Sequence, residues 1–213
     1  CYNCVTTCPK DALAMVPQEE ELDQAPVWDY AVNKVSEKKQ LVAANVKGSQ
    51  FAKPLLEFSG SCAGCAETSY ARLITQVCGD RMFISNATGC SSIWGNPAAT
   101  SPYTVNAEGH GPAWNNSLFE DNAEHGLGFA VGYAAVQDKL VAQTEALLES
   151  DASDELKAAA TAWLENRNDT EGSKTTAAAY VAELEKCGCD ASKAILADKA
   201  YLTKKSFWIF GGD

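Results

Sequence analysis

Apolar residues recur with helical spacing directly after a cysteine-containing loop at residues 62–65. They follow one another at i, i+3, i+4 and i+7: Tyr70, Leu73, Ile74 and Val77. Residues with this spacing lie on one face of an α-helix. The pattern therefore predicts a helix that starts just after the loop and buries these four side chains.

Short continuous apolar runs predict buried strands. Residues 81–87 form one such run, which ends before the Gly89-Cys90 turn. Residues 206–210, Ser-Phe-Trp-Ile-Phe, form a second before Gly-Gly-Asp, the pattern of a core parallel strand that delivers a loop at its carboxyl end. The shorter run at 12–16 is compatible with a third strand.

Helical patterns dominate the second half of the chain. After a loop rich in Gly, Pro and Asn, we expect a helix to begin near Ser117, with Glu120 and Asp121 in its first turn. From about 137 to 199 the chain is rich in Ala, Glu, Leu and Lys, with breaks near 150, 169 and 188. This stretch predicts three or four surface helices without recognisable chemistry.

Composition excludes several classes of protein. The 213 residues carry a formal net charge of -11 and are 46% hydrophobic, as expected of a globular chain that buries one sizeable core or two small ones. An acidic field repels phosphates, which argues against nucleic-acid binding. No stretch approaches the roughly 20 apolar residues that cross a bilayer, so we expect no membrane partner.

The first cysteine group has the spacing of an iron–sulfur motif. Cys1-x2-Cys4-x3-Cys8-Pro9 matches the last three cysteines of the bacterial ferredoxin run C-x2-C-x2-C-x3-C-P. By that pattern Cys1 and Cys4 bind one [4Fe-4S] cluster and Cys8 binds another. Zinc and a disulfide are the alternatives, but no second pair with zinc-ribbon spacing follows closely.

A second group contains Cys62 and Cys65 on a glycine-containing loop. Two thiols at this spacing reach one metal centre, although a C-x-x-C alone is equally compatible with a redox disulfide. Cys90, in a turn after the strand predicted at 81–87, is a plausible third ligand. Of the other cysteines, we expect Cys78 to be a buried small hydrophobe, and Cys187 and Cys189 to be thiols without a role.

Four longer motifs carry a family resemblance. They are the runs Glu57–Thr68, Asn86–Gly95, Asn106–Trp114 and Ser117–Glu124. In this order, and together with the segment Lys204–Asp213, they closely resemble pyruvate:ferredoxin (flavodoxin) oxidoreductase. The resemblance extends from Cys1 to Asp213, and it implies an internal fragment, since both ends of the chain look cut.

The resemblance implies specific ligands. Cys62, Cys65 and Cys90 would bind the [4Fe-4S] cluster beside thiamine diphosphate, with a fourth cysteine near the C-terminus of the full chain. Glu67 would lie against thiamine diphosphate, and the turn around Cys90 would line the same cofactor. Asp213 would open a Gly-Asp-Gly motif that binds Mg²⁺. No catalytic residue is assigned.

The resemblance also implies a fold and a domain plan. The fold class is α/β: part of a thiamine-diphosphate-binding parallel-sheet domain, preceded by the end of a ferredoxin-like α+β cluster domain. Residues 1–17 would end the ferredoxin-like 2[4Fe-4S] domain and 18–54 would form a linker. Residues 55–213 would be the first part of the thiamine-diphosphate domain, with a helical insert at about 137–200.

The implied activity is oxidative decarboxylation of pyruvate with coenzyme A to acetyl-CoA and CO2. The electrons would pass through the [4Fe-4S] clusters to ferredoxin or flavodoxin. The expected partners are the rest of the chain and a second copy in a homodimer, in the cytoplasm. Taken alone, the fragment is expected to be inactive and to hold its clusters poorly.

Two alternatives stay open. One is another 2-oxoacid:ferredoxin oxidoreductase, acting on 2-oxoglutarate or a related acid. The other is a non-catalytic polyferredoxin-type electron carrier, which needs neither Glu67, nor the Asn106–Trp114 loop, nor Asp213.

Overall fold

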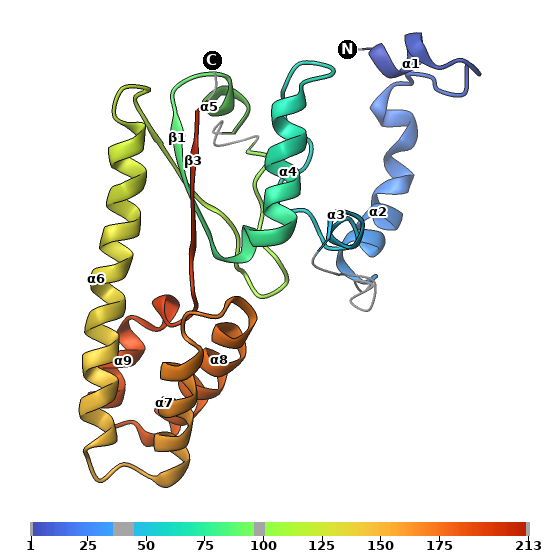
Figure 1. The fold of residues 1–213 in the computed structure, drawn as a ribbon. Helices are drawn as coiled ribbons and strands as arrows, with labels where there is room; N and C mark the ends of the chain where they lie inside the picture. The colour runs from blue at the N-terminus through green and yellow to red at the C-terminus, as the bar shows by residue number, and fades with distance from the viewer. Residues whose placement is uncertain (1, 36–44, 96–100, 212–213) are drawn as a thin grey trace.

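A three-stranded parallel sheet connects the parts of this molecule. The computed structural model describes residues 2–35, 45–95 and 101–211. The strand order is β2-β1-β3, with β1 at Met82–Ala87, β2 at Ala113–Ser117 and β3 at Ser206–Phe210. Both pairings are parallel, so all three strands end at the same edge of the sheet, which lies at the top of Figure 1.

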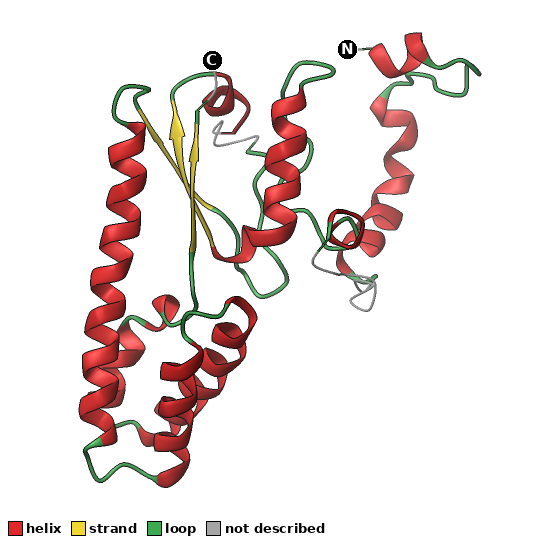
Figure 2. Cartoon of the chain, in the orientation of Figure 1, coloured by secondary structure: helices red, strands yellow, loops and turns green. Residues whose placement is uncertain are grey.

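Helices make up most of the remaining structure (Figure 2). In chain order they are α1 Asn3–Thr7, η1 Gln18–Gln24, α2 Ala25–Asn33, α3 Val46–Ser49, α4 Ala66–Cys78, η3 Gly79–Arg81, α5 Cys90–Gly95, α6 Asn122–Leu148, α7 Asp154–Asn166, α8 Thr170–Cys187, α9 Asp190–Ala197 and η4 Lys199–Tyr201.

Helices α4 and α6 cover opposite faces of the sheet. Side chains alternate between the two faces along each strand, so neighbouring residues of β1 pack against different helices. Ile84 packs with Cys78 of α4 on one face. On the other face, the ring of Phe83 stacks on Phe207 of β3 at 5.4 Å and contacts Phe129 of α6 at 6.1 Å. The result is a small three-layer α/β arrangement (Figure 1).

The largest hydrophobic core lies away from the sheet. We define the helical unit as residues 137–203, which comprise the second half of α6 together with α7, α8, α9 and η4. The unit buries ten hydrophobic side chains in one cluster: Leu140, Leu147, Leu156, Ala160, Trp163, Ala177, Tyr180, Leu184, Ile195 and Leu202. On α7 and α8 these positions recur every three or four residues, as an amphipathic helix requires.

The sheet region, residues 55–136 and 204–211, has smaller cores. One cluster contains Leu56, Ala71 and Trp94, and a second contains Cys78, Met82 and Ile84. The segment before it is still more exposed, since α1, η1 and α2 bury no residue. The two strands predicted within the sheet region, at 81–87 and 206–210, are confirmed by β1 and β3.

Two sequence expectations were wrong in detail. Residues 12–16 form no strand and have no partner strand among the described residues. The segment 18–54 contains η1, α2 and α3, and its assignment as a linker or surface strap stays a prediction. The helix expected near Ser117 begins at Asn122 instead, because residues 113–117 pair with β1 as a strand.

The buried face of α4 is shifted by one position from the predicted face. Tyr70 and Val77 are exposed, whereas Ala71, Thr75 and Cys78 are buried. The helix itself was predicted correctly, but its orientation depended on the surface against which it packs.

Helix α6 passes through residue 137 without a break. The predicted start of the helical insert at that position therefore lies inside a continuous helix. The breaks predicted near 150, 169 and 188 coincide with the ends of α6, α7 and α8. Among the described residues, no helix is both long enough and apolar enough to cross a membrane.

Candidate functional site at the carboxyl edge of the sheet

Cys62 and Cys65 lie on one tight turn that leads into α4. The Cys65 amide donates a hydrogen bond to the Cys62 carbonyl at 3.1 Å. Gly64 occupies the third position of the turn with a φ of 77°, as a type II turn requires. Cys65 precedes the first helical residue but its thiol caps no backbone amide. Both thiols are free, and Cys62 is exposed.

Hydroxyl groups attach this loop to the first turn of α4. The Ser61 hydroxyl lies 3.2 Å from that of Ser59 and 3.4 Å from that of Thr68. The Thr68 hydroxyl also donates to the Cys65 carbonyl at 3.3 Å. Just before the loop, Phe58 adopts a φ of 56°, a left-handed conformation that is costly for a bulky residue. The position of the two thiols is therefore fixed by several local interactions.

Cys90 lies at the carboxyl end of β1, where α5 begins, and its free thiol is exposed. The turn before it is closed by Ser92, whose hydroxyl donates to the Gly89 carbonyl at 2.6 Å. The N-terminus of α4, the start of α5 and the ends of β1 and β3 all lie at the top of Figure 1. The fold thus brings the second cysteine group and Cys90 to the same edge of the sheet.

The three thiols share this edge without meeting at a single point. Among the described residues, no group of three or more His, Cys, Asp or Glu side chains is arranged to hold a metal ion. The assignment of Cys62, Cys65 and Cys90 to one cluster therefore stays a prediction. What the fold provides is two thiols on one turn and a third on the neighbouring turn.

Glu67 lies in the first turn of α4 and is half-buried. Burial, followed by the charge of Glu67, raises the pKa of the Tyr103 hydroxyl. Tyr103 packs against Trp94 of α5, with ring centroids 6.2 Å apart. The charge of Glu67 is therefore close enough to Tyr103 to act on its hydroxyl.

Buried polar atoms without a hydrogen-bond partner among the described residues gather in this part of the molecule. They include the hydroxyls of Ser91 and Tyr103 and the indole nitrogens of Trp94 and Trp114. A buried polar group without a hydrogen bond costs about 1–3 kcal/mol of folding free energy. Several such groups close together are therefore uncommon in the core of a folded protein. These atoms are available to partners that the described residues do not supply.

A buried polar network that the sequence did not suggest connects α6 to the strand ends. The Asn122 side-chain amide donates to the Phe210 carbonyl at 3.0 Å, which turns its carbonyl oxygen toward Ser85 at 2.6 Å. Ser85 must then donate to Asn122, so it can only accept from Nδ1 of His125, 2.7 Å away. Because Ser85 is fully buried, this pair is an anchor for α6 and not a nucleophile and base.

A second network joins β1 to β2 at the same edge. The side-chain amide of Asn86 donates to the side-chain oxygen of Asn116 at 3.0 Å, and Asn116 donates to the Thr88 hydroxyl at 2.9 Å. Thr88 in turn donates to the Ser117 carbonyl at 2.9 Å. Asparagine in a strand is unfavourable by propensity, so its recurrence at 86, 115 and 116 was the available signal for a specialised strand end.

The first cysteine group is only partly described. Cys4 lies on α1 with an exposed thiol, and Cys8 follows the helix. The Cys8 sulfur accepts a hydrogen bond from the Ala12 amide at 3.4 Å, and this and neighbouring backbone amides lower its pKa. Cys1 and Asp213 lie outside the described residues.

The Asn106–His110 loop leads into the amino end of β2, the opposite end of that strand from Ser117. The Asn106 side chain accepts hydrogen bonds from the amides of Glu108 and His110, and Gly109 supplies a φ of 80°. His110 is exposed and its Nδ1 lies 3.9 Å from the Glu108 carboxylate. We therefore place this loop outside the group of residues at the carboxyl edge.

Comparison with known proteins assigns the chain to a family. No family model matches it. Over its whole length, however, it is 49% identical to the pyruvate-flavodoxin oxidoreductase of Klebsiella pneumoniae and 47% identical to the pyruvate:ferredoxin oxidoreductase of Moorella thermoacetica. The chain belongs to this family of pyruvate oxidoreductases.

The chain corresponds to only a part of these relatives. The aligned segment makes up 18% of the Klebsiella protein and 19% of the Moorella protein. The same segment is 42% identical, over the whole chain, to the mitochondrial pyruvate dehydrogenase [NADP(+)] of Euglena gracilis, of which it covers 12%. The names of these oxidoreductases share pyruvate and differ in the electron acceptor.

Proposed function

We propose that this chain is part of an enzyme that oxidatively decarboxylates pyruvate with coenzyme A to acetyl-CoA and CO2. Its electrons pass through [4Fe-4S] clusters to ferredoxin or flavodoxin. The observation that carries the proposal is the similarity to the Klebsiella and Moorella enzymes along the entire chain. Relatives named for different acceptors share this segment and share pyruvate in their names, which favours pyruvate as the substrate.

Cys62, Cys65 and Cys90 are the ligands we propose for the cluster nearest the cofactor. Thiolates are the protein ligands of [4Fe-4S] clusters. Three free thiols at one sheet edge, none of them used in a disulfide or a helix cap, suit that donor set. The fourth ligand is proposed to come from another part of the full enzyme, and Cys4 and Cys8 to serve ferredoxin-type clusters.

Thiamine diphosphate is proposed to bind next to Glu67. The half-buried carboxylate and the unpartnered hydroxyl of Tyr103 suit a polar ligand, and the carboxyl edge of a parallel sheet is the usual place for one. When bound, this cofactor supplies the carbanion-stabilising chemistry that a 2-oxo acid needs to lose CO2. Asp213 stays the proposed Mg²⁺ ligand.

The remaining expectations stay proposals too. They are the thiamine-diphosphate and ferredoxin-like domain assignments, the homodimer and the cytoplasmic location. A carrier function without catalysis is less well supported, because the Klebsiella, Moorella and Euglena relatives are all named as pyruvate enzymes. A related 2-oxo acid as substrate remains the alternative that experiment must separate.

Substitution of the proposed ligands in the full-length enzyme tests the cluster assignment. Cys62→Ser, Cys65→Ser and Cys90→Ser should each lower the iron content by about one cluster per chain and abolish pyruvate-dependent ferredoxin reduction. Cys78→Ser is the matched control, since this thiol is buried against Ile84 and is not a proposed ligand. Unchanged iron in the Cys90 variant would overturn the assignment.

Substrate identity needs a separate measurement on the unmodified full-length enzyme. Reduction of ferredoxin with coenzyme A should be supported by pyruvate and only weakly by 2-oxoglutarate. Comparable rates with the two acids would favour the broader 2-oxoacid function. An enzyme that reduces no acceptor with either acid while holding all its clusters would favour the carrier.

A further inference from the structure

Cys187 and Cys189 lie side by side, far along the chain from both predicted groups of cluster ligands. Cys187 is the last residue of α8, and Cys189 immediately precedes α9. The Cys187 thiol donates to the Cys189 sulfur, with the two Sγ atoms 2.9 Å apart. Both side chains are exposed. The expectation that these thiols have no role does not explain this arrangement.

The backbone on either side of the pair is fixed. Gly188 ends α8 with a φ of 62°, and its amide donates to the Leu184 carbonyl at 3.2 Å, as in a left-handed helix cap. The Cys189 carbonyl accepts from the Lys193 amide at 2.9 Å as α9 begins. Leu184 and Ile195 anchor the two helices in the core of the helical unit. The two sulfurs are therefore held together by the fold and not by chance contact of a loose loop.

The geometry suits a disulfide better than a metal. Two thiolates on a tetrahedral zinc ion, with Zn–S bonds of about 2.3 Å, lie about 3.8 Å apart. The observed 2.9 Å is shorter, and it approaches the disulfide bond length of about 2.05 Å. Among the described residues no third ligating side chain joins the pair. A two-electron dithiol is the chemistry that remains.

Cys189 is suited to attack first. Its pKa is lowered to about 7 by the hydrogen bond from Cys187 and then by those from the hydroxyl and amide of Ser192. The Ser192 hydroxyl lies 3.2 Å from the Cys189 sulfur and is buried, so this partner stays in place. A thiolate is the nucleophilic form of cysteine, and Cys189 reaches it near neutral pH.

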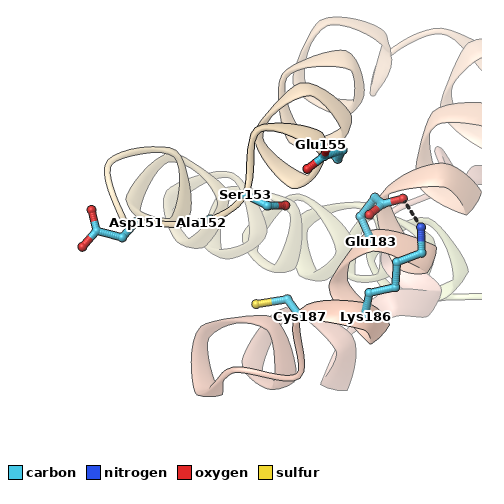
Figure 3. Close-up of a pocket in the computed structure, with 7 residues that line it drawn as sticks. All are labelled: Asp151, Ala152, Ser153, Glu155, Glu183, Lys186 and Cys187. Carbon is cyan, nitrogen blue, oxygen red and sulfur yellow. Dashed lines mark hydrogen bonds and ion pairs between the residues drawn. The ribbon is translucent and has the colours of Figure 1, made fainter.

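The surroundings of the pair favour a small uncharged oxidant. Cys187 lines a shallow pocket of about 460 Å³ together with the acidic residues Asp151, Glu155 and Glu183 (Figure 3). The only cation among its lining residues, Lys186, is paired with Glu183 at 2.6 Å. This excess of negative charge repels anionic disulfides but not hydrogen peroxide.

We propose that Cys187 and Cys189 form a redox-active dithiol that reduces a small hydroperoxide and closes to an intramolecular disulfide. The Cys189 thiolate attacks one peroxide oxygen, the O–O bond breaks, and Cys189 becomes a sulfenic acid as hydroxide leaves. The Cys187 thiol then displaces that hydroxyl as water, forming the S–S bond. Two thiols and one hydrogen peroxide thus give one disulfide and two waters. A dithiol reductant restores the pair by exchange.

A peptide-mapping experiment on the full-length enzyme tests this site directly. The protein is exposed to hydrogen peroxide without oxygen, its remaining thiols are alkylated, and it is cleaved with trypsin. Cleavage after Lys186 and Lys193 places both cysteines in one peptide, Cys-Gly-Cys-Asp-Ala-Ser-Lys. We expect this peptide to lose two hydrogens, to resist alkylation and to recover after dithiothreitol. A peptide that stays fully alkylated, or that carries only sulfinic or sulfonic acid, would overturn the proposal.

Two serine variants separate the roles of the two thiols. In Cys187→Ser the hydroxyl still donates to Cys189, so Cys189 should react about fivefold faster than N-acetylcysteine at pH 7 and stop at a sulfenic acid that dimedone traps. In the unmodified protein, the rate of the first oxidation step should rise with pH through a midpoint near 7. Cys189→Ser should form neither sulfenic acid nor disulfide at comparable rates. Both side chains are exposed, so circular dichroism should confirm an unchanged fold.

A final comparison tests the choice of oxidant. Oxidised glutathione carries net negative charge, so at equal concentration it should oxidise the pair more slowly than hydrogen peroxide, and high salt should narrow the gap. A faster reaction with oxidised glutathione would overturn the peroxide assignment. None of these outcomes depends on pyruvate turnover, so failure of this proposal is distinguishable from failure of the proposed function.

Discussion

The helical unit and the sheet region differ in how completely they bury their hydrophobic side chains. The helical unit buries ten hydrophobic side chains in one cluster, whereas the clusters of the sheet region each contain three. The sheet region also leaves Leu118, Phe119, Leu127, Val131 and Ile209 exposed. The part of the chain with almost no predicted chemistry is thus the part with the more complete core.

Most of the buried polar atoms without a partner among the described residues lie in the sheet region, and Gln143 Oε1 is the exception in the helical unit. The unpartnered buried atoms of Ser91, Trp94, Tyr103 and Trp114 all belong to the sheet region. In the helical unit, by contrast, Trp163 donates to the Leu202 carbonyl and Tyr180 to the Thr144 hydroxyl. The sheet region thus leaves more buried polar atoms without a partner among the described residues than the helical unit does.

The largest expected effect comes from the core of the helical unit. Trp163 is fully buried, stacks on Tyr180 at 5.7 Å and donates a hydrogen bond to Leu202. Trp163→Ala should lower the free energy of unfolding by about 3–5 kcal/mol. Urea denaturation followed by circular dichroism measures the loss. Trp28→Ala, at an exposed position of α2, should change it by less than about 0.5 kcal/mol, and equal losses would refute the comparison.

The second effect concerns the contact between α6 and the sheet. A Cβ atom at Gly126 would lie 2.5 Å from Cγ1 of Ile209 and 3.3 Å from Cβ of Ser85. Gly126→Ala should therefore destabilise the chain by about 1–3 kcal/mol, although alanine is the better helix former. Gly132→Ala, with open space around its Cβ, should instead stabilise by about 0.5–1 kcal/mol. Thermal unfolding of the two variants should shift in opposite directions.

A smaller effect is expected from a buried hydrogen bond of the helical unit. The Tyr180 hydroxyl donates to the Thr144 hydroxyl at 3.1 Å in a buried environment. Tyr180→Phe should cost about 0.5–1.5 kcal/mol, because Thr144 loses its donor. Tyr70→Phe, on the exposed side of α4, is the control and should be neutral. A neutral Tyr180 variant in urea denaturation would show that this bond adds nothing to the core.

The smallest effect concerns the ion pair between the two regions. Lys174 of α8 lies 2.7 Å from Asp80 of η3. Burial acts to lower the lysine pKa, but the hydrogen bonds and charges of Asp80 and then Glu171 together outweigh it, and the pKa is raised above 10.5. A raised lysine pKa stabilises the fold fully below the unfolded pKa, and this stability is lost as pH rises through the folded pKa.

Lys174→Gln should therefore cost at most about 1 kcal/mol at pH 7, since both side chains are partly solvated. Its difference from the unmodified chain should vanish above the raised pKa. Chemical denaturation at pH 7 and at strongly alkaline pH measures both quantities. Lys186→Gln removes a pair within α8 alone and serves as the control. A difference that grows with pH would contradict this account.

The sequence was informative where a pattern depends only on local geometry. The strand at 81–87, the strand at 206–210 and the breaks between the later helices follow from apolar runs and from residues such as Gly188 that end helices. The C-x-x-C turn likewise needs only Gly64 and a hydrogen bond within four residues. These features were predictable because the chain makes them with its own neighbours.

Strand β2 was missed because its sequence, Ala-Trp-Asn-Asn-Ser, lacks an apolar alternation. It becomes a strand by pairing with β1, and the side chain of Asn116 is satisfied by Asn86 and Thr88 from another part of the chain. The orientation of α4 was mistaken for a related reason. Which of its sides is buried depends on the sheet and not on its own residues.

By itself, the sequence determined the identity and spacing of the thiols, the strands β1 and β3, the breaks between the later helices, and the family to which the chain belongs. Only the tertiary structure brought Cys90 to the sheet edge that carries the Cys62–Cys65 turn, and only it paired Cys187 with Cys189 across a fixed helix junction. The physical reason is that the separation of two residues along the sequence decides which near neighbours each can contact. Packing against distant elements decides which groups meet.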